Sequence, residues 1–481
     1  MSQQQWDVVI GLEIHVRLAL KSKLFSGASA QYGATPNSQV SFLDAALPGT
    51  LPVVNSKAIE YALRFGLSID AEIPEVTRFA RKNYFYPDLP KGYQISQMDD
   101  PIVGRGRIEI DTGKGRKSVN ITRAHLEEDA GKSIHDQYDD WTAIDLNRAG
   151  TALIEVVSEP ELYSAKEAVA YMRAIYNRVT FLGICDGNLQ EGSFRCDANV
   201  SLKPKGGETL GTRAEVKNLN SFRFIEKAIN FEIKRQAKLL ESGEKVVQET
   251  RLYDAEQDVT RSMRGKEDAN DYRYFPDPDL PALKITADML DKQRASMPEL
   301  PEAKLQRYIQ EWNLPEDNAA QLAYDVAMSG FFEHSQALTK ATAADNAKFL
   351  ITDFNALLNE QSSDMIGSQI SAENYAGLLD AMASAQISRK IAKQVLTDMW
   401  HTGKSAQTII EAQGLAQISD SNALKTIIQQ VVDNNPKQVE QYRSGNEKMF
   451  NFFIGQVMKQ TKGQANPVQT KQILEELLSN E

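Results

Sequence analysis

Hydrophobic and polar residues alternate strictly along the first part of the chain, over residues 6–18. In a β-strand such alternation places the two classes on opposite faces. One face is apolar, and the other carries Glu13, His15 and Arg17 in a row. Similar alternation recurs at 117–126, 151–158, 195–202 and 213–217. These five segments predict strands of a half-buried sheet with one polar face.

Helical signals interrupt the strands and then replace them. Segments 164–182 and 221–242 each begin with a serine suited to the N-cap and end just before a glycine. Beyond Ser296 strand patterns almost disappear, and helical periodicity covers 301–312, 317–337, 340–359, 371–384 and 388–401. The sequence therefore predicts an α+β fold, in which a β-rich, largely antiparallel domain precedes an all-helical domain and a small helical tail. The expected boundaries are 1–295, 296–401 and 402–481.

Composition narrows the class of protein without naming it. Hydrophobic residues make up 42% of the chain and charged residues 25%, which is usual for a globular protein. No stretch approaches the roughly 18 apolar residues of a membrane span, and the first residues have no signal-peptide pattern. Cys185 and Cys196 do not form a disulfide framework, and alternation puts Cys196 on the packed side of its strand. We expect a cytoplasmic protein that does not bind membranes; its net charge of −11 argues weakly against a nucleic-acid binder.

The polar face is rich in carboxylates that would repel one another if they met. Two carboxylates about 5 Å apart repel by roughly 3 kcal/mol at an effective dielectric constant of about 20. A group containing Glu13, Glu127 and Glu128 would therefore take up protons or bind a divalent cation. Oxygen ligands with a single imidazole, such as that of His15, suit Mg²⁺ or Mn²⁺ better than zinc. The competing interpretation is a solvated sheet face with alternating charges.

Two further patterns are typical of nucleotide binding. Lys82, Tyr84 and Tyr86 lie in a proline-stiffened loop that mixes aromatic and basic residues, and 271–279 has the same character. Lys217 and Asn218 end a strand directly before the helix expected to begin at Ser221, where backbone N–H groups attract phosphate. An ordinary packed loop and an ordinary helix cap explain these patterns as well. P-loop, Rossmann and kinase signatures are absent from the sequence.

Several long motifs resemble the B subunits of the tRNA-dependent amidotransferases (GatCAB), and the resemblance runs through nearly the whole chain. The motifs occupy 11–15 (Gly-Leu-Glu-Ile-His), 81–88 (Arg-Lys-Asn-Tyr-Phe-Tyr-Pro-Asp), 125–132 (His-Leu-Glu-Glu-Asp-Ala-Gly-Lys), 145–151 (Asp-Leu-Asn-Arg-Ala-Gly-Thr), 154–160 (Ile-Glu-Val-Val-Ser-Glu-Pro), 195–199 (Arg-Cys-Asp-Ala-Asn), 215–222 (Glu-Val-Lys-Asn-Leu-Asn-Ser-Phe), 271–279 (Asp-Tyr-Arg-Tyr-Phe-Pro-Asp-Pro-Asp) and 462–467 (Lys-Gly-Gln-Ala-Asn-Pro).

The resemblance implies an enzyme subunit that uses ATP and Mg²⁺. It would phosphorylate the side-chain carboxylate of misacylated Glu-tRNA(Gln) or Asp-tRNA(Asn), and ammonia from glutamine would then displace the phosphate. The expected partners are an amidase (A) subunit, which hydrolyses glutamine, a small C subunit and the tRNA. The implied fold is a β-rich cradle, a helical domain and a helical tail that touches the tRNA.

Roles for individual residues follow from the matching motifs. Glu13, His15, Glu127 and Glu128 match the metal-binding motifs and are the expected catalytic residues, and Glu155, Asp197 and Glu215 are expected as further metal ligands. Lys82, Arg195, Lys217 and Asn218 are expected to bind the phosphates of ATP. Tyr84, Tyr86, Lys459 and Lys462 are expected to bind the tRNA. Some relatives carry four zinc-binding cysteines where this chain has Ser26, Ala28, Ser41 and Asp44, so no structural zinc is expected.

Two other functions remain compatible with the residues alone. The same carboxylates suit a metal-dependent phosphohydrolase or RNA nuclease with a two-metal centre. The residues are also compatible with a non-catalytic scaffold that binds tRNA and whose acidic face is solvated. From residue 402 onward the chain has eight basic and eight acidic residues, so its charges balance. Binding of tRNA by this tail would therefore depend on the local arrangement of the basic residues.

Overall fold

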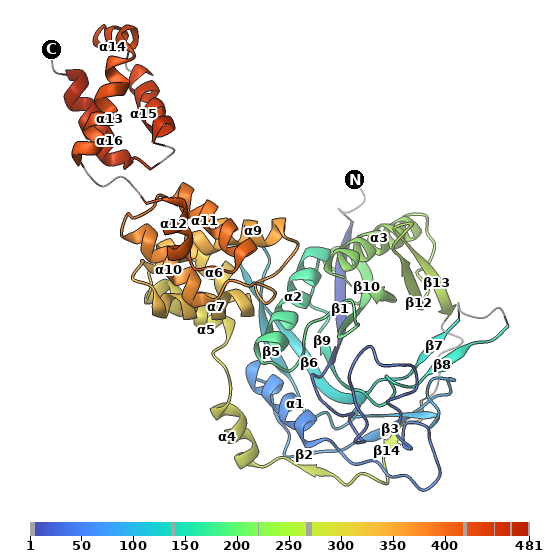
Figure 1. The fold of residues 1–481 in the computed structure, drawn as a ribbon. Helices are drawn as coiled ribbons and strands as arrows, with labels where there is room; N and C mark the ends of the chain where they lie inside the picture. Colours follow the sequence, from blue (N-terminus) through green and yellow to red (C-terminus); the bar gives the residue numbers. More distant parts are fainter. Residues whose placement is uncertain are drawn as a thin grey trace. The chain divides into compact units, whose positions relative to one another are not determined.

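The chain divides into two compact units, Met1–Leu300 and Pro301–Glu481, each of which is described by itself (Figure 1). The structure is a computed structural model that describes residues 5–135, 140–219, 221–265, 272–416, 421–446, 448–461 and 464–479.

Unit 1 is built around an eight-stranded sheet in the order β13-β12-β11-β10-β1-β9-β6-β5. Every neighbouring pair is antiparallel except β11 and β12, which confirms the predicted α+β class with a largely antiparallel sheet. The eight strands are β1 (Trp6–Arg17), β5 (Gly106–Asp111), β6 (Arg116–Glu128), β9 (Ala152–Ser158), β10 (Phe194–Pro204), β11 (Ala214–Leu219), β12 (Glu249–Asp254) and β13 (Val259–Gly265).

Three small sheets complete the strands of unit 1. They pair β2 (Val76–Thr77) with β15 (Leu283–Lys284), β3 (Ala80–Asn83) with β4 (Tyr93–Ser96) and β14 (Phe275–Pro276), and β7 (Lys132–Ile134) with β8 (Ala143–Asp145). Through β3 and β14, the two aromatic and basic loops lie beside each other, although almost 190 residues separate them in the sequence.

The apolar face of the large sheet is covered by helices, and this leaves the opposite face for polar residues. The helices are α1 (Ser56–Ser68), α2 (Ala165–Phe181) and α3 (Phe222–Glu241), whose buried side chains share one hydrophobic core with the even-numbered residues of β1. Both predicted serine caps are confirmed, since Ser164 accepts from the N–H of Glu167 and Ser221 from that of Phe224. Cys196 is buried in this core, as the alternation predicted. A further helix, α4 (Ala287–Ala295), follows near the end of the unit.

The elements that the structure describes in unit 2 are all helices, joined by loops. Its helices are α5 (Pro301–Gln310), α6 (Glu316–Ala323), α7 (Val326–Leu338), α8 (Ala343–Phe349), the π-helical turn Leu350–Phe354, α9 (Asn355–Glu360), α10 (Ala372–Ala383), α11 (Arg389–Thr402), α12 (Ala406–Gln413), α13 (Ser421–Asp433), α14 (Pro436–Arg443), α15 (Lys448–Gln460) and α16 (Pro467–Ser479). The single helix predicted over 317–337 is wrong. Two helices occupy the region because Asp325 leaves helical geometry and its side chain accepts from the N–H of Met328, which starts α7.

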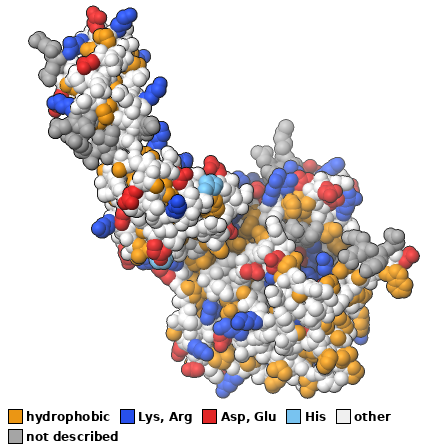
Figure 2. Space-filling model, viewed as in Figure 1, with side chains coloured by type: hydrophobic (Ala, Val, Ile, Leu, Met, Phe, Trp, Pro, Cys, Tyr) orange, Lys and Arg blue, Asp and Glu red, His pale blue; other side chains and the backbone are white. Residues whose placement is uncertain are grey.

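Two hydrophobic clusters stabilise unit 2, one running from Leu305 to Ile410 and one from Leu424 to Leu478. Helix α12 packs in the first cluster, although it lies beyond the predicted boundary at 402; the three-domain division itself stays a prediction. Figure 2 shows basic and acidic side chains interspersed over the face of this unit that it presents. In the described part of the chain, no helix is long and apolar enough to cross a membrane.

Candidate metal and substrate site

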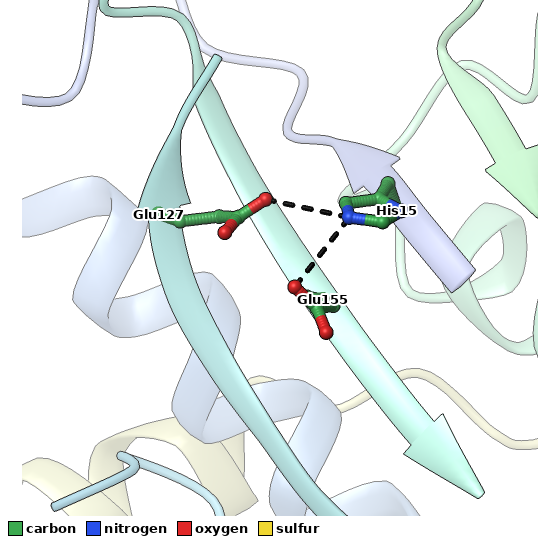
Figure 3. A group of neighbouring side chains, drawn as sticks. All are labelled: His15, Glu127 and Glu155. Atoms are coloured by element: carbon green, nitrogen blue, oxygen red, sulfur yellow. Dashed lines mark ion pairs between the residues drawn. The ribbon is translucent and has the colours of Figure 1, made fainter. Parts of the chain in front are cut away.

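Three neighbouring strands bring His15, Glu127 and Glu155 together on the polar face of the large sheet (Figure 3). The register places His15 opposite Glu155, and Glu155 in turn opposite His125. His15 Nε2 lies 3.5 Å from Glu127 Oε1 and 3.4 Å from Glu155 Oε2. One ligand atom from each of these residues lies within 4.8 Å of those of the other two. We call these three residues the histidine–carboxylate cluster.

Burial and mutual charge push the protonation states of the cluster in different directions. Burial disfavours the charged imidazole of His15, but its contacts with Glu155 and Glu127 raise its pKa to about 9. Burial and the charge of Glu155 raise the pKa of Glu127. Burial also disfavours a charge on Glu155, yet the imidazoles of His125 and His15 hold its pKa well below the usual range. Burial and the neighbouring charges thus shift the pKa values of the two carboxyl groups in opposite directions, a pattern common at functional sites.

The geometry of the cluster fits a small divalent cation. Ligands about 2.1 Å from a six-coordinate Mg²⁺ lie roughly 3 Å from one another, close to the separations of 3.4 and 3.5 Å found here. Two carboxylates and one imidazole are also a donor set suited to Mg²⁺ or Mn²⁺. The side chains of Glu127 and Glu155 are only 5% and 13% exposed, so a bound ion would offset a charge that little water reaches.

His125 belongs to this site, although sequence reasoning did not assign it a role. Its imidazole is buried, and its Nε2 lies 3.5 Å from Glu155 Oε2 and 3.9 Å from Glu127 Oε2. Its Nδ1 has no hydrogen-bond partner among the described residues. The signal was present, because residues 125 and 127 share a strand face. His125 touches both carboxylates without adding a third oxygen, and this arrangement is suited to orienting them.

Replacing His125 by glutamine is expected to weaken Mn²⁺ binding by about tenfold, because groups that orient metal ligands contribute about that much affinity. Calorimetric titration of the full chain with Mn²⁺ measures the effect. The control is His334→Gln, whose side chain is 59% exposed on α7. Equal affinities for the two variants would contradict the orienting role of His125.

A second group of charged residues lies beside the cluster, toward β10 and β11. Asp197 faces Glu13 across the strand pair, and Lys217 Nζ lies 2.8 Å from Asp197 Oδ2 and 3.1 Å from Glu215 Oε1. Burial and the charges of Glu155, Glu215 and Asp197 raise the pKa of Glu13, whereas a hydrogen bond from Asn199 lowers it. The structure therefore brings four of the predicted residues together here, with Lys217 held by carboxylates.

Two residues predicted for the site, Glu128 and Arg195, contact charged groups outside the histidine–carboxylate cluster. Glu128 does not join the cluster: alternation along β6 puts it on the opposite face from Glu127, where its Oε1 accepts from Lys91 Nζ and from the N–H of Ile95. Arg195, expected near phosphate, pairs with Asp129 Oδ2 at 3.0 Å.

An aromatic and basic wall, formed by Lys82, Tyr84, Tyr272 and Tyr274, lies near the cluster from β3 and the segment before β14. The rings of Tyr84 and Tyr272 are 5.9 Å apart, and Lys82 Nζ lies 4.9 Å from the centre of the Tyr272 ring. Burial and then the charges of Glu127 and Glu128 raise the pKa of Tyr84. The pKa of Glu127 is raised by burial and by Glu155, and the charge of Lys82 offsets part of that rise. The wall therefore stands within electrostatic reach of Glu127.

The remaining predicted residues are more peripheral. Tyr86 is 51% exposed and packs edge-on against Tyr84, and Lys459 is exposed in the last turn of α15. Lys462 lies outside the described residues, as does the side chain of Asn218. Where zinc ligands would stand in some relatives, Asp44 instead forms a buried ion pair with Lys23, with Nζ and Oδ2 2.8 Å apart.

Comparisons with known proteins place the chain in a family. A family model described as the GatB/GatE catalytic domain matches residues 8–291, and one described as the GatB domain matches 331–478. The chain is 52% identical to a protein of Thioalkalivibrio sulfidiphilus over 98% of its own length and the full length of the relative. Proteins of Bordetella pertussis and Pseudomonas aeruginosa are each 53% identical over 98% of this chain and 99% of their own length. All three are named as the B subunit of aspartyl/glutamyl-tRNA(Asn/Gln) amidotransferase.

The large sheet, with its histidine–carboxylate cluster, thus lies inside a catalytic domain of the GatB/GatE class. The chain belongs to the family of amidotransferase B subunits, GatB, along nearly its whole length.

Proposed function

We propose that this chain is the subunit of a glutamine-hydrolysing, tRNA-dependent amidotransferase that activates the carboxylate of Glu-tRNA(Gln) or Asp-tRNA(Asn). The observation that carries the proposal is the buried histidine–carboxylate cluster within the matched catalytic domain. The names of the relatives supply the substrate class. A carboxylate reacts poorly with ammonia, whereas an acyl phosphate has a good leaving group, so the reaction needs ATP at the same site.

His15, Glu127 and Glu155 would hold Mg²⁺, with Glu13 and the carboxylates of Asp197 and Glu215 next to them. When bound, the ion would neutralise the phosphate charge that otherwise repels an approaching carboxylate. His125 keeps the two glutamates oriented, and Lys217 balances the charge of Asp197 and Glu215. Lys82 would meet the ATP phosphates, and Tyr84 and Tyr86 would offer stacking surfaces to the acceptor end of the tRNA.

The proposed partners are an amidase (A) subunit that supplies ammonia and a small C subunit, in a heterotrimer that acts in the cytoplasm during translation. The relatives are each named as one subunit of an amidotransferase, which supports a multi-subunit enzyme. We further propose that residues 402–481 contact the body of the tRNA, with Lys459 and Lys462 at its phosphates. Helix α15, which carries Lys459, is part of the second hydrophobic cluster of unit 2.

The test is the conversion of Glu-tRNA(Gln) by the full chain together with its amidase and small partners. We expect formation of Gln-tRNA(Gln) that requires ATP and Mg²⁺ and releases one phosphate for each amide formed. The length of the tRNA after incubation is measured in parallel. Cleaved tRNA would favour the nuclease alternative, and amidation without ATP would contradict the proposed activation step.

A further inference from the structure

Two buried glutamines, Gln94 and Gln97, join the small sheet that carries part of the aromatic and basic wall to the strand that carries Glu127. Gln94 lies in β4, and Gln97 follows that strand directly. β4 belongs to the three-stranded sheet, whereas β6 belongs to the large sheet. The hydrogen bonds of these two side chains therefore connect the two sheets next to the histidine–carboxylate cluster.

The two amides lie along one edge of β6. The neighbouring strand β5 covers this edge only as far as Ile121. Farther along β6, the N–H of Leu126 donates to Gln97 Oε1 at 3.0 Å. Gln94 Nε2 donates to the C=O of Glu128 at 2.7 Å. The side-chain amides thus supply the partners that the backbone of an adjacent strand would otherwise provide.

These bonds hold the backbone on both sides of Glu127. Leu126 and Glu128 are its direct neighbours in β6, and each has one backbone group bound by a glutamine. The N–H of Leu126 also belongs to the peptide group that joins it to His125. Since successive side chains of a strand alternate, fixing this stretch of backbone fixes the direction in which His125 and Glu127 project.

Each glutamine is held in turn by a second partner. Gln97 Nε2 donates to Thr77 Oγ1 at 2.8 Å, and Thr77 is buried in β2. Gln94 Oε1 accepts from the hydroxyl group of Tyr84 at 3.3 Å. Gln94 also lies opposite Lys82 in the pairing of β4 with β3. One amide is therefore fixed in the protein interior, and the other is linked to the aromatic and basic wall.

Glu128 adds to this connection from the side of β6. Its Oε1 accepts from the N–H of Ile95, in β4, at 2.9 Å, and it also accepts from Lys91 Nζ. The ammonium group of Lys91 balances the charge of this carboxylate. The contact between β4 and β6 is thus made of neutral amides and one balanced ion pair, so it adds no net charge beside the cluster.

We propose that Gln94 and Gln97 are positioning residues, which hold Glu127 and the aromatic and basic wall in a fixed relation to each other. The inference rests on the proposed function, in which Glu127 binds the ion and the wall meets the substrates. Groups that react together must be held to within about half an ångström, so the two sheets that carry them need a rigid connection. A glutamine amide suits this role because it offers donors and an acceptor without a charge.

Gln97→Met tests the connection, because methionine has a similar length but makes neither hydrogen bond. We expect the full chain with this change to bind Mn²⁺ about tenfold more weakly in a calorimetric titration, as for other groups that orient metal ligands. Gln94→Met should weaken Mn²⁺ binding similarly. In the enzyme assembled with its partners, Gln94→Met should also raise the KM for Glu-tRNA(Gln) more than Gln97→Met does, because only Gln94 holds Tyr84.

The matched control is Gln293→Met, a change in a buried glutamine of the same unit. Gln293 lies on α4, and its Oε1 accepts from Arg64. Thermal unfolding should show a loss of stability in all three variants, whereas only Gln94→Met and Gln97→Met should lose Mn²⁺ affinity. If Gln97→Met did not fold, Thr77→Val would decide the question, since it removes only the partner of Gln97 Nε2.

Unchanged Mn²⁺ affinity in the folded β4 variants would overturn the inference. An equal loss of affinity in Gln293→Met would overturn it as well, because the effect would then follow from lower stability alone. A wild-type chain that binds no Mn²⁺ would instead refute the metal site of the proposed function.

Discussion

Glu155→Gln is expected to reduce ATP-dependent amidation by a hundredfold or more while the partner amidase still hydrolyses glutamine. Glu155 lies between the two imidazoles of the site, with its Oε2 3.4 Å from His15 Nε2 and 3.5 Å from His125 Nε2. Glutamine keeps the shape of the side chain but removes the negative charge that a cation needs. Changes in groups that merely support metal ligands cost about 10- to 100-fold, so loss of a ligand charge should cost more.

Two measurements separate this effect from a general loss of structure. Mn²⁺ titration should show weakened binding by Glu155→Gln, and thermal unfolding should show that the variant is folded. Glu373→Gln on α10 is the matched control, because its side chain is 61% exposed and it lies in unit 2. Amidation by Glu155→Gln at the rate of this control would rule out the cluster as the metal site.

Asp44→Ala is expected to lower the free energy of unfolding by about 3–5 kcal/mol, the usual cost of leaving one charge of a buried pair alone. Lys23 and Asp44 have side-chain exposures of 0% and 2%. Without Asp44, the ammonium group of Lys23 keeps only the carbonyl of Leu146, 3.3 Å away, and the N–H of Ser41 loses its acceptor. Urea unfolding followed by tryptophan fluorescence measures the change.

The control for the buried pair is an exposed one on α1. Lys57 Nζ lies 2.7 Å from Glu60 Oε2, and the two side chains are 49% and 29% exposed. Glu60→Ala should therefore lower the free energy of unfolding by less than about 1 kcal/mol. Replacing both buried partners, as in Lys23→Met with Asp44→Leu, should restore part of the lost stability, because no unpaired charge remains. If Asp44→Ala and Glu60→Ala proved equally mild, the pair would not stabilise this segment.

Alternation identified the polar face of the sheet but not which of its residues meet. From periodicity alone, His15 and Glu127 could be assigned to polar faces of two strands, 112 positions apart in the chain. Only the strand order, with β9 between β1 and β6, brings them to 3.5 Å and inserts Glu155 between them. Glu127 and Glu128 belong to the same motif, yet successive side chains of a strand point to opposite faces. Glu127 therefore joins the cluster, whereas Glu128 binds Lys91.

The sequence by itself determined the class of fold, the helix caps at Ser164 and Ser221, the apolar side of each strand and, through its motifs, the family. These properties depend on neighbouring residues or on long matching segments. The tertiary structure decided the ion pair of Lys23 with Asp44 and the place of His125 beside Glu155. Each of these depends on contacts between distant segments, and such contacts are set by strand order and register, which local periodicity does not specify.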